Sequence, residues 1–61
     1  MNKKLIDAVV NYFGNQSAMA RTLGVSRASV SYWIVTGHIP ASRAIQIEKV
    51  TEGEFKATNL C

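Results

Sequence analysis

Cysteine is nearly absent from this 61-residue sequence: the one cysteine is Cys61, so no internal disulfide can form. We therefore expect a fold that does not need an oxidising compartment. Long hydrophobic runs are absent too, because no apolar stretch approaches the roughly 18 residues that span a bilayer. Near the start, Asp7 and Asn11 interrupt the apolar residues that a signal peptide would need. These absences predict a soluble protein that acts in the cytoplasm.

Residues that carry chemistry are also few. The one histidine, His38, has no cysteine or histidine partner at the spacing of metal ligands. The acidic residues look like solvated helix charges rather than a catalytic pair, and there are four of them: Asp7, Glu48, Glu52 and Glu54. An enzyme is therefore the least favoured class of protein, and we expect no metal, no cofactor and no small-molecule substrate.

Acidic residues are fewer than basic residues. Seven lysines and arginines stand against four acids, which gives a formal charge of +3 and favours a polyanion such as nucleic acid as the partner. Hydrophobic residues make up 48% of the chain, a share typical of a folded domain. The sequence has no internal repeat, low-complexity tract or linker. Residues 1–61 are therefore predicted to form a single domain.

The middle of the chain, QSAMARTLGVSRASVSYW, predicts two helices joined by a tight turn. Asn15 is placed to cap the free backbone N–H groups of a helix from Gln16 to Leu23. Gly24 follows at the position where a positive φ is often needed. Ser26 is a good N-cap for a second helix from Arg27 to Val35.

The second of these helices has two different faces. Val30 and Trp33, three residues apart, can share an apolar core with Leu23 of the first helix. The opposite face is small and polar with one arginine, which suits the base edges of the DNA major groove. We expect four residues of this face to contact bases: Arg27, Ala28, Ser31 and Tyr32. Residues 16–33 therefore form a helix-turn-helix pattern.

Polar residues around the motif are candidates for contact with the DNA backbone. The first turn of a helix offers unpaired N–H groups and a positive dipole end to an anion. The predicted phosphate-contacting residues are Asn15, Gln16, Ser17, Arg21, Ser26 and His38. For each of them the alternative is an ordinary exposed polar position, and the sequence leaves both interpretations open.

Helical patterns also flank the motif. Apolar residues recur on one face from Lys3 to Phe13, which predicts an amphipathic helix that ends at Gly14. A further helix is predicted from Pro40 to Val50. The segment 51–61 is compatible with a short helix carrying Phe55 or with a strand, and we favour the helical turn. The fold class is therefore all-α, a small helix-turn-helix bundle of four to five helices.

The helix that starts at Pro40 offers two apolar faces. Ala44 and Ile45 are expected to pack on the helix-turn-helix. The other face is predicted to form a partner surface together with residues nearer the end of the chain. This surface, the candidate dimer interface, comprises Ile47, Val50, Phe55 and Leu60.

Nearly the whole chain, from about Leu5 to Gly53, resembles a known family. The segments FGNQSAMARTLGVSRASVSYW and IPASRAIQIEKVTEG are similar to the core of the Cro repressors of lambdoid phages, especially their all-helical branch. They also resemble the related YdaS-like phage and prophage regulators. The resemblance implies a lambda-repressor-like domain that binds palindromic operator DNA as a homodimer and represses transcription in a bacterial host cell.

Two other functions are weighed beside this one. The first is a helical protein-interaction module, or an antitoxin-like regulator, that binds another protein through the partner surface of Ile47, Val50, Phe55 and Leu60. A stable complex with a co-encoded protein, unaffected by charge changes at Arg27, would favour it. The second is an enzyme, which the scarcity of catalytic residues sets aside.

Overall fold

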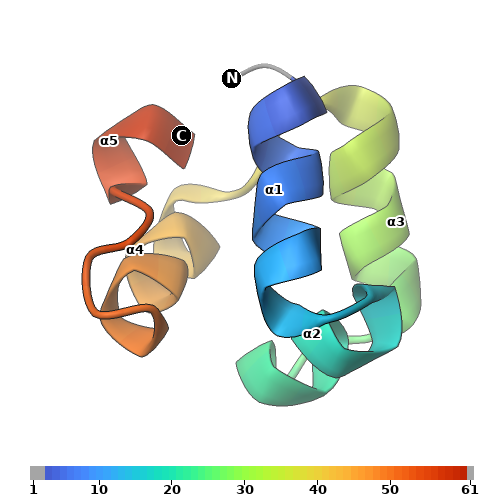
Figure 1. Ribbon diagram of the computed structural model, residues 1–61. Helices are drawn as coiled ribbons and strands as arrows, with labels where there is room; N and C mark the ends of the chain where they lie inside the picture. Colours follow the sequence, from blue (N-terminus) through green and yellow to red (C-terminus); the bar gives the residue numbers. More distant parts are fainter. Residues whose placement is uncertain (1–2, 61) are drawn as a thin grey trace.

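The computed structural model describes residues 3–60, and Met1, Asn2 and Cys61 lie outside the described part. Within residues 3–60 the chain is all-helical, as predicted, and contains no strand. Its helices are α1 (Lys3–Phe13), α2 (Gln16–Leu23), α3 (Arg27–Thr36), α4 (Ala41–Val50) and α5 (Ala57–Leu60). Figure 1 shows α1, α2 and α3 grouped together, with α4 and α5 packed as a pair beside them. None of these helices is both long and apolar enough to cross a membrane.

The helix-turn-helix is bounded by the predicted caps. The Oδ1 of Asn15 accepts a hydrogen bond from the Ala18 N–H at 2.8 Å, and the Oγ of Ser26 accepts one from the Ser29 N–H at 3.2 Å. Gly24 ends α2 with φ 72°, a left-handed conformation that glycine adopts without steric penalty. The predicted bounds of α2 are confirmed, whereas α3 continues one residue past the predicted end at Val35.

The outer helices begin and end close to their predicted bounds. Helix α1 covers the predicted residues Lys3–Phe13. Helix α4 begins at Ala41 because Pro40 takes the N-cap position, with φ −56° and ψ 147°, instead of the first helical position. A proline before the first turn is compatible with the helix since the missing N–H would have had no intrahelical partner.

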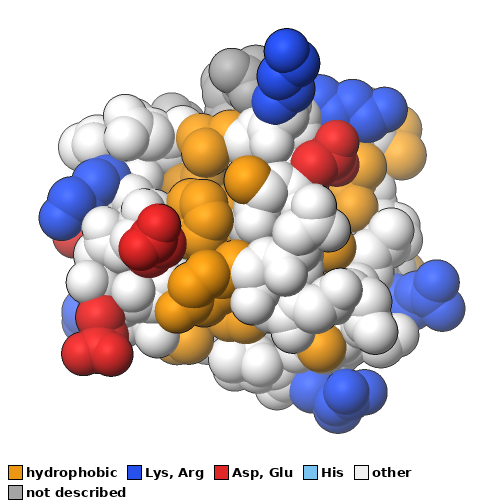
Figure 2. All heavy atoms as spheres, in the orientation of Figure 1, with side chains coloured by type: hydrophobic (Ala, Val, Ile, Leu, Met, Phe, Trp, Pro, Cys, Tyr) orange, Lys and Arg blue, Asp and Glu red, His pale blue; other side chains and the backbone are white. Residues whose placement is uncertain are grey.

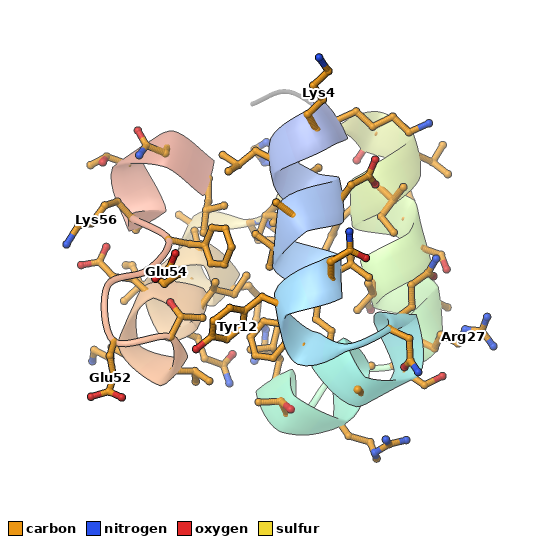
Figure 3. All side chains as sticks on the ribbon, viewed as in Figure 1. Lys4, Tyr12, Arg27, Glu52, Glu54 and Lys56 are labelled. Atoms are coloured by element: carbon orange, nitrogen blue, oxygen red, sulfur yellow. The ribbon has the colours of Figure 1, made fainter. Side chains whose placement is uncertain are left out.

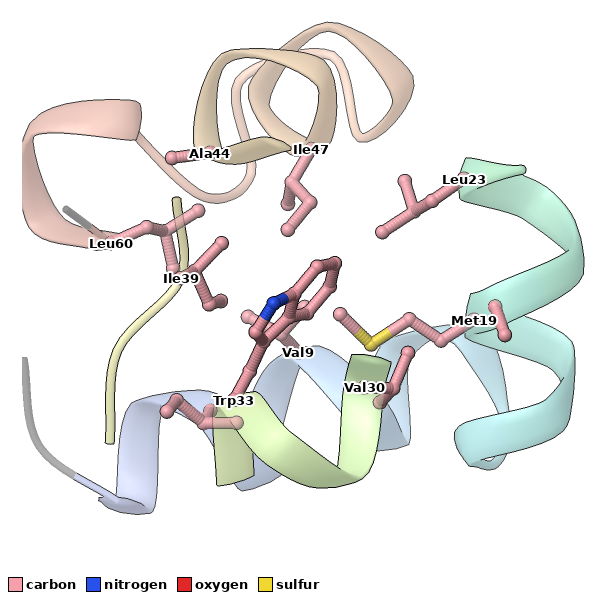
Figure 4. Packing of buried hydrophobic residues seen from close by; sticks show 11 residues of the cluster. Val9, Met19, Leu23, Val30, Trp33, Ile39, Ala44, Ile47 and Leu60 are labelled. Atoms are coloured by element: carbon pink, nitrogen blue, oxygen red, sulfur yellow. The ribbon is translucent and has the colours of Figure 1, made fainter. Parts of the chain in front are cut away.

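The hydrophobic core lies between the two groups of helices. Figure 4 shows Trp33 at its centre, with Met19 and Ile39 on either side and Ile47 reaching down from α4. The buried apolar side chains among residues 3–60 are Ile6, Val9, Met19, Ala20, Leu23, Val30, Trp33, Ile39, Ala44, Ile47 and Leu60. Every helix contributes to this set, so the helices form one packed unit.

The end of the chain is fastened to α4. Residues 51–53 form a turn and residues 54–55 a bend, and α5 follows with its Ala57 N–H donating to the Oε1 of Glu48 at 2.7 Å. The Oγ1 of Thr51 donates to the Ile47 carbonyl at 2.7 Å and accepts from the Phe55 N–H at 3.4 Å. The predicted short helix is therefore present, but Phe55 precedes it and does not lie on it.

The predicted faces of α4 need correction. Ala44 and Ile47, three residues apart, are both fully buried, whereas Ile45 is 50% exposed. The expectation that Ile45 packs on the helix-turn-helix is wrong because α4 is rotated to place the line through Ala44 and Ile47 inward. Leu60 is fully buried as well. The prediction that Ile47 and Leu60 lie at a dimer surface is therefore wrong, since the monomer's own core covers both side chains.

Candidate nucleic-acid interface

Helix α3 carries an outward face that takes no part in the core. Arg27 and Ala28 are exposed, Tyr32 is 67% exposed and Ser31 is half-buried. The opposite side of the same helix is buried through Val30 and Trp33 (Figure 4). The structure therefore brings the four residues predicted to contact bases onto one accessible surface.

The side chain of Ser31 forms a hydrogen bond with a residue of a neighbouring helix. Its Oγ donates a hydrogen bond to the Oε1 of Gln16 at 2.7 Å, which joins the middle of α3 to the first residue of α2. A serine hydroxyl has one hydrogen and two acceptor lone pairs, so its remaining capacity is to accept. The same bond uses the oxygen of the Gln16 amide and turns the two N–H donors of that amide away from Ser31.

The capping side chains lie at the starts of the two motif helices. The Oγ of Ser26 lies 3.1 Å from the Oγ of Ser29 in addition to its backbone bond. Asn15 and Ser26 are both exposed, and Ser17 in the first turn of α2 is half-buried. Because caps hold the first turns in place, the backbone N–H groups at these two helix ends are fixed in direction.

Charge is unevenly distributed along the chain. No aspartate or glutamate occurs from residue 8 to residue 47, a stretch that contains the helix-turn-helix together with Arg21 and Arg27. Both of these arginines are exposed. Figure 3 places Glu52 and Glu54 on the side of the molecule away from Arg27, and Figure 2 shows basic atoms at the edge where α3 lies. Helices α2 and α3 themselves therefore present positive charge and no carboxylate to an approaching anion.

His38 stands apart from the other predicted contacts. It is exposed in the segment after α3, and its backbone N–H donates to the Trp33 carbonyl at 3.2 Å. The ten residues of α3 separate it from Arg27 by about 15 Å at the rise of an α-helix. The structure therefore places His38 at one end of α3 and Arg27 at the other.

A clamp on α2 was not predicted from the sequence. The Nη1 of Arg43 and the Nε2 of Gln46 both donate to the Leu23 carbonyl, at 3.1 and 3.0 Å. The same Nη1 also donates to the Oε1 of Gln46 at 2.7 Å. This Arg43–Gln46 clamp ties α4 to the end of α2 just before the turn, and it thereby holds the helix-turn-helix on the rest of the domain.

The matched family agrees with this arrangement. Residues 6–60 match the family model described as the DNA-binding transcriptional regulator Cro. The chain belongs to this Cro family. The protein is therefore a DNA-binding transcriptional regulator of the phage or prophage type, and its family is not a family of enzymes.

Individual relatives, one described as Cro and one as a putative transcriptional regulator, support the same classification. The chain is 44% identical over 48 residues to the regulatory protein Cro of Salmonella phage P22, a match that covers 79% of this chain and 75% of that protein. It is 55% identical over 48 residues to YdaS of Escherichia coli (strain K12), covering 77% of this chain. The matched part is 49% of YdaS, so the chain spans about half the length of that relative.

A solved structure confirms the fold. The Cro protein of the Xfaso 1 element in Xylella fastidiosa strain Ann-1 superimposes with a TM-score of 0.85 at 42% sequence identity. The superposition covers 98% of this chain and 89% of that one. The resemblance to Cro and YdaS-like regulators that the sequence motifs indicate is thus confirmed by sequence and by structure.

Proposed function

We propose that this Cro-family protein is a repressor that reads palindromic operator DNA with α3 in the major groove. The observation that carries the proposal is the outward face of α3, which is polar, exposed at Arg27 and free of acidic neighbours in sequence from residue 8 to residue 47. An α-helix fits the width of the major groove, where each base pair presents a distinct pattern of donors and acceptors. Repression would follow from occupying DNA that the polymerase of the bacterial host needs.

Each residue of this face has a distinct proposed role. Arg27 donates a bidentate pair of hydrogen bonds to guanine, and Ala28 contacts a thymine methyl group. Ser31 accepts a hydrogen bond from an amino group of adenine or cytosine, since its hydrogen is already donated to Gln16. Tyr32 reaches either a base or a phosphate from its exposed position.

The DNA backbone is proposed to lie across the starts of α2 and α3. Gln16 and Ser17 would hold a phosphate at the N-terminus of α2, where the unpaired N–H groups and the helix dipole favour an anion. Arg21 supplies a positive charge from the last turn of the same helix. The proposed phosphate contacts are completed by Asn15, Ser26 and His38. Such contacts fix the register of the protein on DNA, while the base contacts specify the sequence.

We predict that Arg27→Ala relaxes the base preference at one position of the operator by about 1–3 kcal/mol. The loss follows from the removal of the paired donors, and the fold should be unaffected because Arg27 is exposed. The measurement is a binding titration over several salt concentrations on a site selected with the wild-type protein, with random duplex as the reference.

Arg21→Ala is the matched control for this titration. As a phosphate contact it should weaken binding to all sequences alike and lower the salt slope by about one. If wild-type protein prefers no site over random duplex at physiological salt, the proposed function is wrong. If Arg27→Ala and Arg21→Ala behave alike, Arg27 does not read a base.

Two copies on one operator would multiply the discrimination of each monomer. Half-sites for such dimers lie about one helical turn, roughly 34 Å, apart. Of the predicted dimer residues, Val50 is 42% exposed and Phe55 is half-buried. The accessible apolar surface of these two side chains can therefore contact a second copy of the chain. Phe55 also stacks edge-on against Tyr12, with ring centroids 5.6 Å apart.

We predict that Val50→Asp abolishes cooperative binding to a palindromic site and leaves binding to an isolated half-site unchanged. A charge placed at an apolar contact between copies would lose hydration without gaining a partner. Ile45→Asp is the matched control, because Ile45 is 50% exposed on the same helix but points in another direction. If the two variants give equal binding curves on the palindrome, Val50 is not part of the dimer contact.

A further inference from the structure

The outward face of α3 contains one large apolar residue that the function described so far does not use. Val35 is 84% exposed, more than any other large hydrophobic side chain in the described part of the protein. With Ala28 and Tyr32 it follows the helical spacing i, i+4 and i+7, which places the three side chains in one line along the helix. We refer to Ala28, Tyr32 and Val35 as the outer stripe.

The fold does not explain the outer stripe. The core side of α3 is occupied by Val30 and Trp33. The edge-on aromatic pairs of residues 3–60 are Tyr12–Phe13 and Tyr12–Phe55, so Tyr32 belongs to neither. Valine is also a slightly weak helix former because its branched side chain is stiff at χ1. An exposed valine at this position therefore stabilises neither the helix nor the core.

We propose that Val35 is a specificity-determining residue that contacts the methyl group of a thymine in the major groove. This inference rests on the proposed function, because it requires α3 to enter the groove. The thymine methyl is the apolar group that base pairs present there, and apolar side chains are the groups that contact it. A stiff valine presents its methyl groups in one fixed direction, which suits contact with a single small group.

Charge and size favour DNA over a protein as the occupant of the outer stripe. Arg27 and Ser31 flank the stripe, and the acid-free stretch from residue 8 to residue 47 surrounds it in sequence. Ala28 and Ser31 are small, so α3 can approach the floor of the groove closely enough for a valine to touch a base. These features fit duplex DNA, a polyanion that presents apolar thymine methyl groups in its major groove.

The helix geometry sets the spacing of the methyl groups that the stripe would read. Ala28 and Val35 are seven positions apart, or about 10.5 Å at the rise of an α-helix. A helix in the major groove runs obliquely to the DNA axis, so this length spans at most about three base pairs at 3.4 Å each. We therefore expect two methyl-sensitive thymines in each half-site, at most about three base pairs apart, of which one depends on Val35 and the other on Ala28.

Replacement of single thymines by deoxyuridine tests the proposal, because it removes the methyl group and leaves every hydrogen-bonding group in place. A binding site is first selected from a random duplex library with the wild-type protein. Each thymine is then replaced in turn, and the dissociation constant is measured for the wild type and for Val35→Ala. At one thymine we expect wild-type binding to weaken about fourfold, the value of one buried methyl-sized group. Val35→Ala should show no loss at that thymine.

The controls separate this proposal from the proposed function. Val35→Ala should fold normally since Val35 is exposed, and it should keep the uracil effect at the thymine assigned to Ala28. Ile45→Ala, an exposed apolar truncation outside α3, should keep both effects. If a site is selected but the wild type and Val35→Ala respond alike to every uracil, the role of Val35 is overturned and the proposed function stands. If no site is selected, both proposals fail.

Discussion

Trp33→Ala will remove most of the stability of the protein at room temperature. Trp33 is 5% exposed at the centre of the core, between side chains from α2, α4 and the segment before α4 (Figure 4). Truncating such a residue costs about 3–5 kcal/mol through lost burial and the cavity that remains. Small domains have a total stability near the lower end of the usual range of about 5–15 kcal/mol. The measurement is urea unfolding followed by circular dichroism.

Tyr32→Ala is the matched control, because it truncates an aromatic residue of the same helix that is 67% exposed. Its free energy of unfolding should stay within about 0.5 kcal/mol of the wild-type value. A Trp33→Ala variant with a cooperative transition and a loss similar to that of Tyr32→Ala would show that the core does not depend on the indole ring.

Leu60→Ala should lower the free energy of unfolding by about 2–5 kcal/mol, the range for truncating a buried leucine. Leu60 lies in α5 and is fully buried, so its truncation leaves a cavity in the core of each monomer. The measurement is urea unfolding at two protein concentrations that differ by about a hundredfold. Because the cavity lies within one chain, the loss should be the same at both concentrations.

Asn59→Ala provides the comparison for Leu60→Ala, since Asn59 is an exposed residue of the same short helix. Its unfolding should be close to that of the wild type. A stability loss for Leu60→Ala that grows with protein concentration would instead show that Leu60 lies at a contact between two copies of the chain.

Local signals account for the accuracy with which the motif was predicted. Asn15 and Ser26 each bond a backbone N–H three residues ahead, so the signal and its partner lie within one turn of helix. Gly24 likewise ends α2 through its own backbone conformation. Short-range geometry of this kind depends on residue type and spacing alone, which a single sequence supplies.

Long-range contacts could not be predicted in the same way. The Ser31–Gln16 bond joins residues 15 positions apart, and the Arg43–Gln46 clamp reaches back 20 and 23 positions to the Leu23 carbonyl. The rotation of α4 was also mispredicted, because isoleucines stand on both of its sides and periodicity alone does not say which side the core will cover. The tertiary packing decides these features. The proposed DNA contacts remain predictions.

The division of α3 into two faces has a consequence for the evolution of this protein. Val30 and Trp33 hold the domain together from one side, while Ala28, Tyr32 and Val35 on the other side are exposed, and we expect folding not to depend on them. Mutations on the outer side can therefore be sampled without loss of stability, so a lineage could move to a new operator through folded intermediates. Libraries randomised at these three positions should contain mostly folded members and offer a direct source of altered DNA specificity.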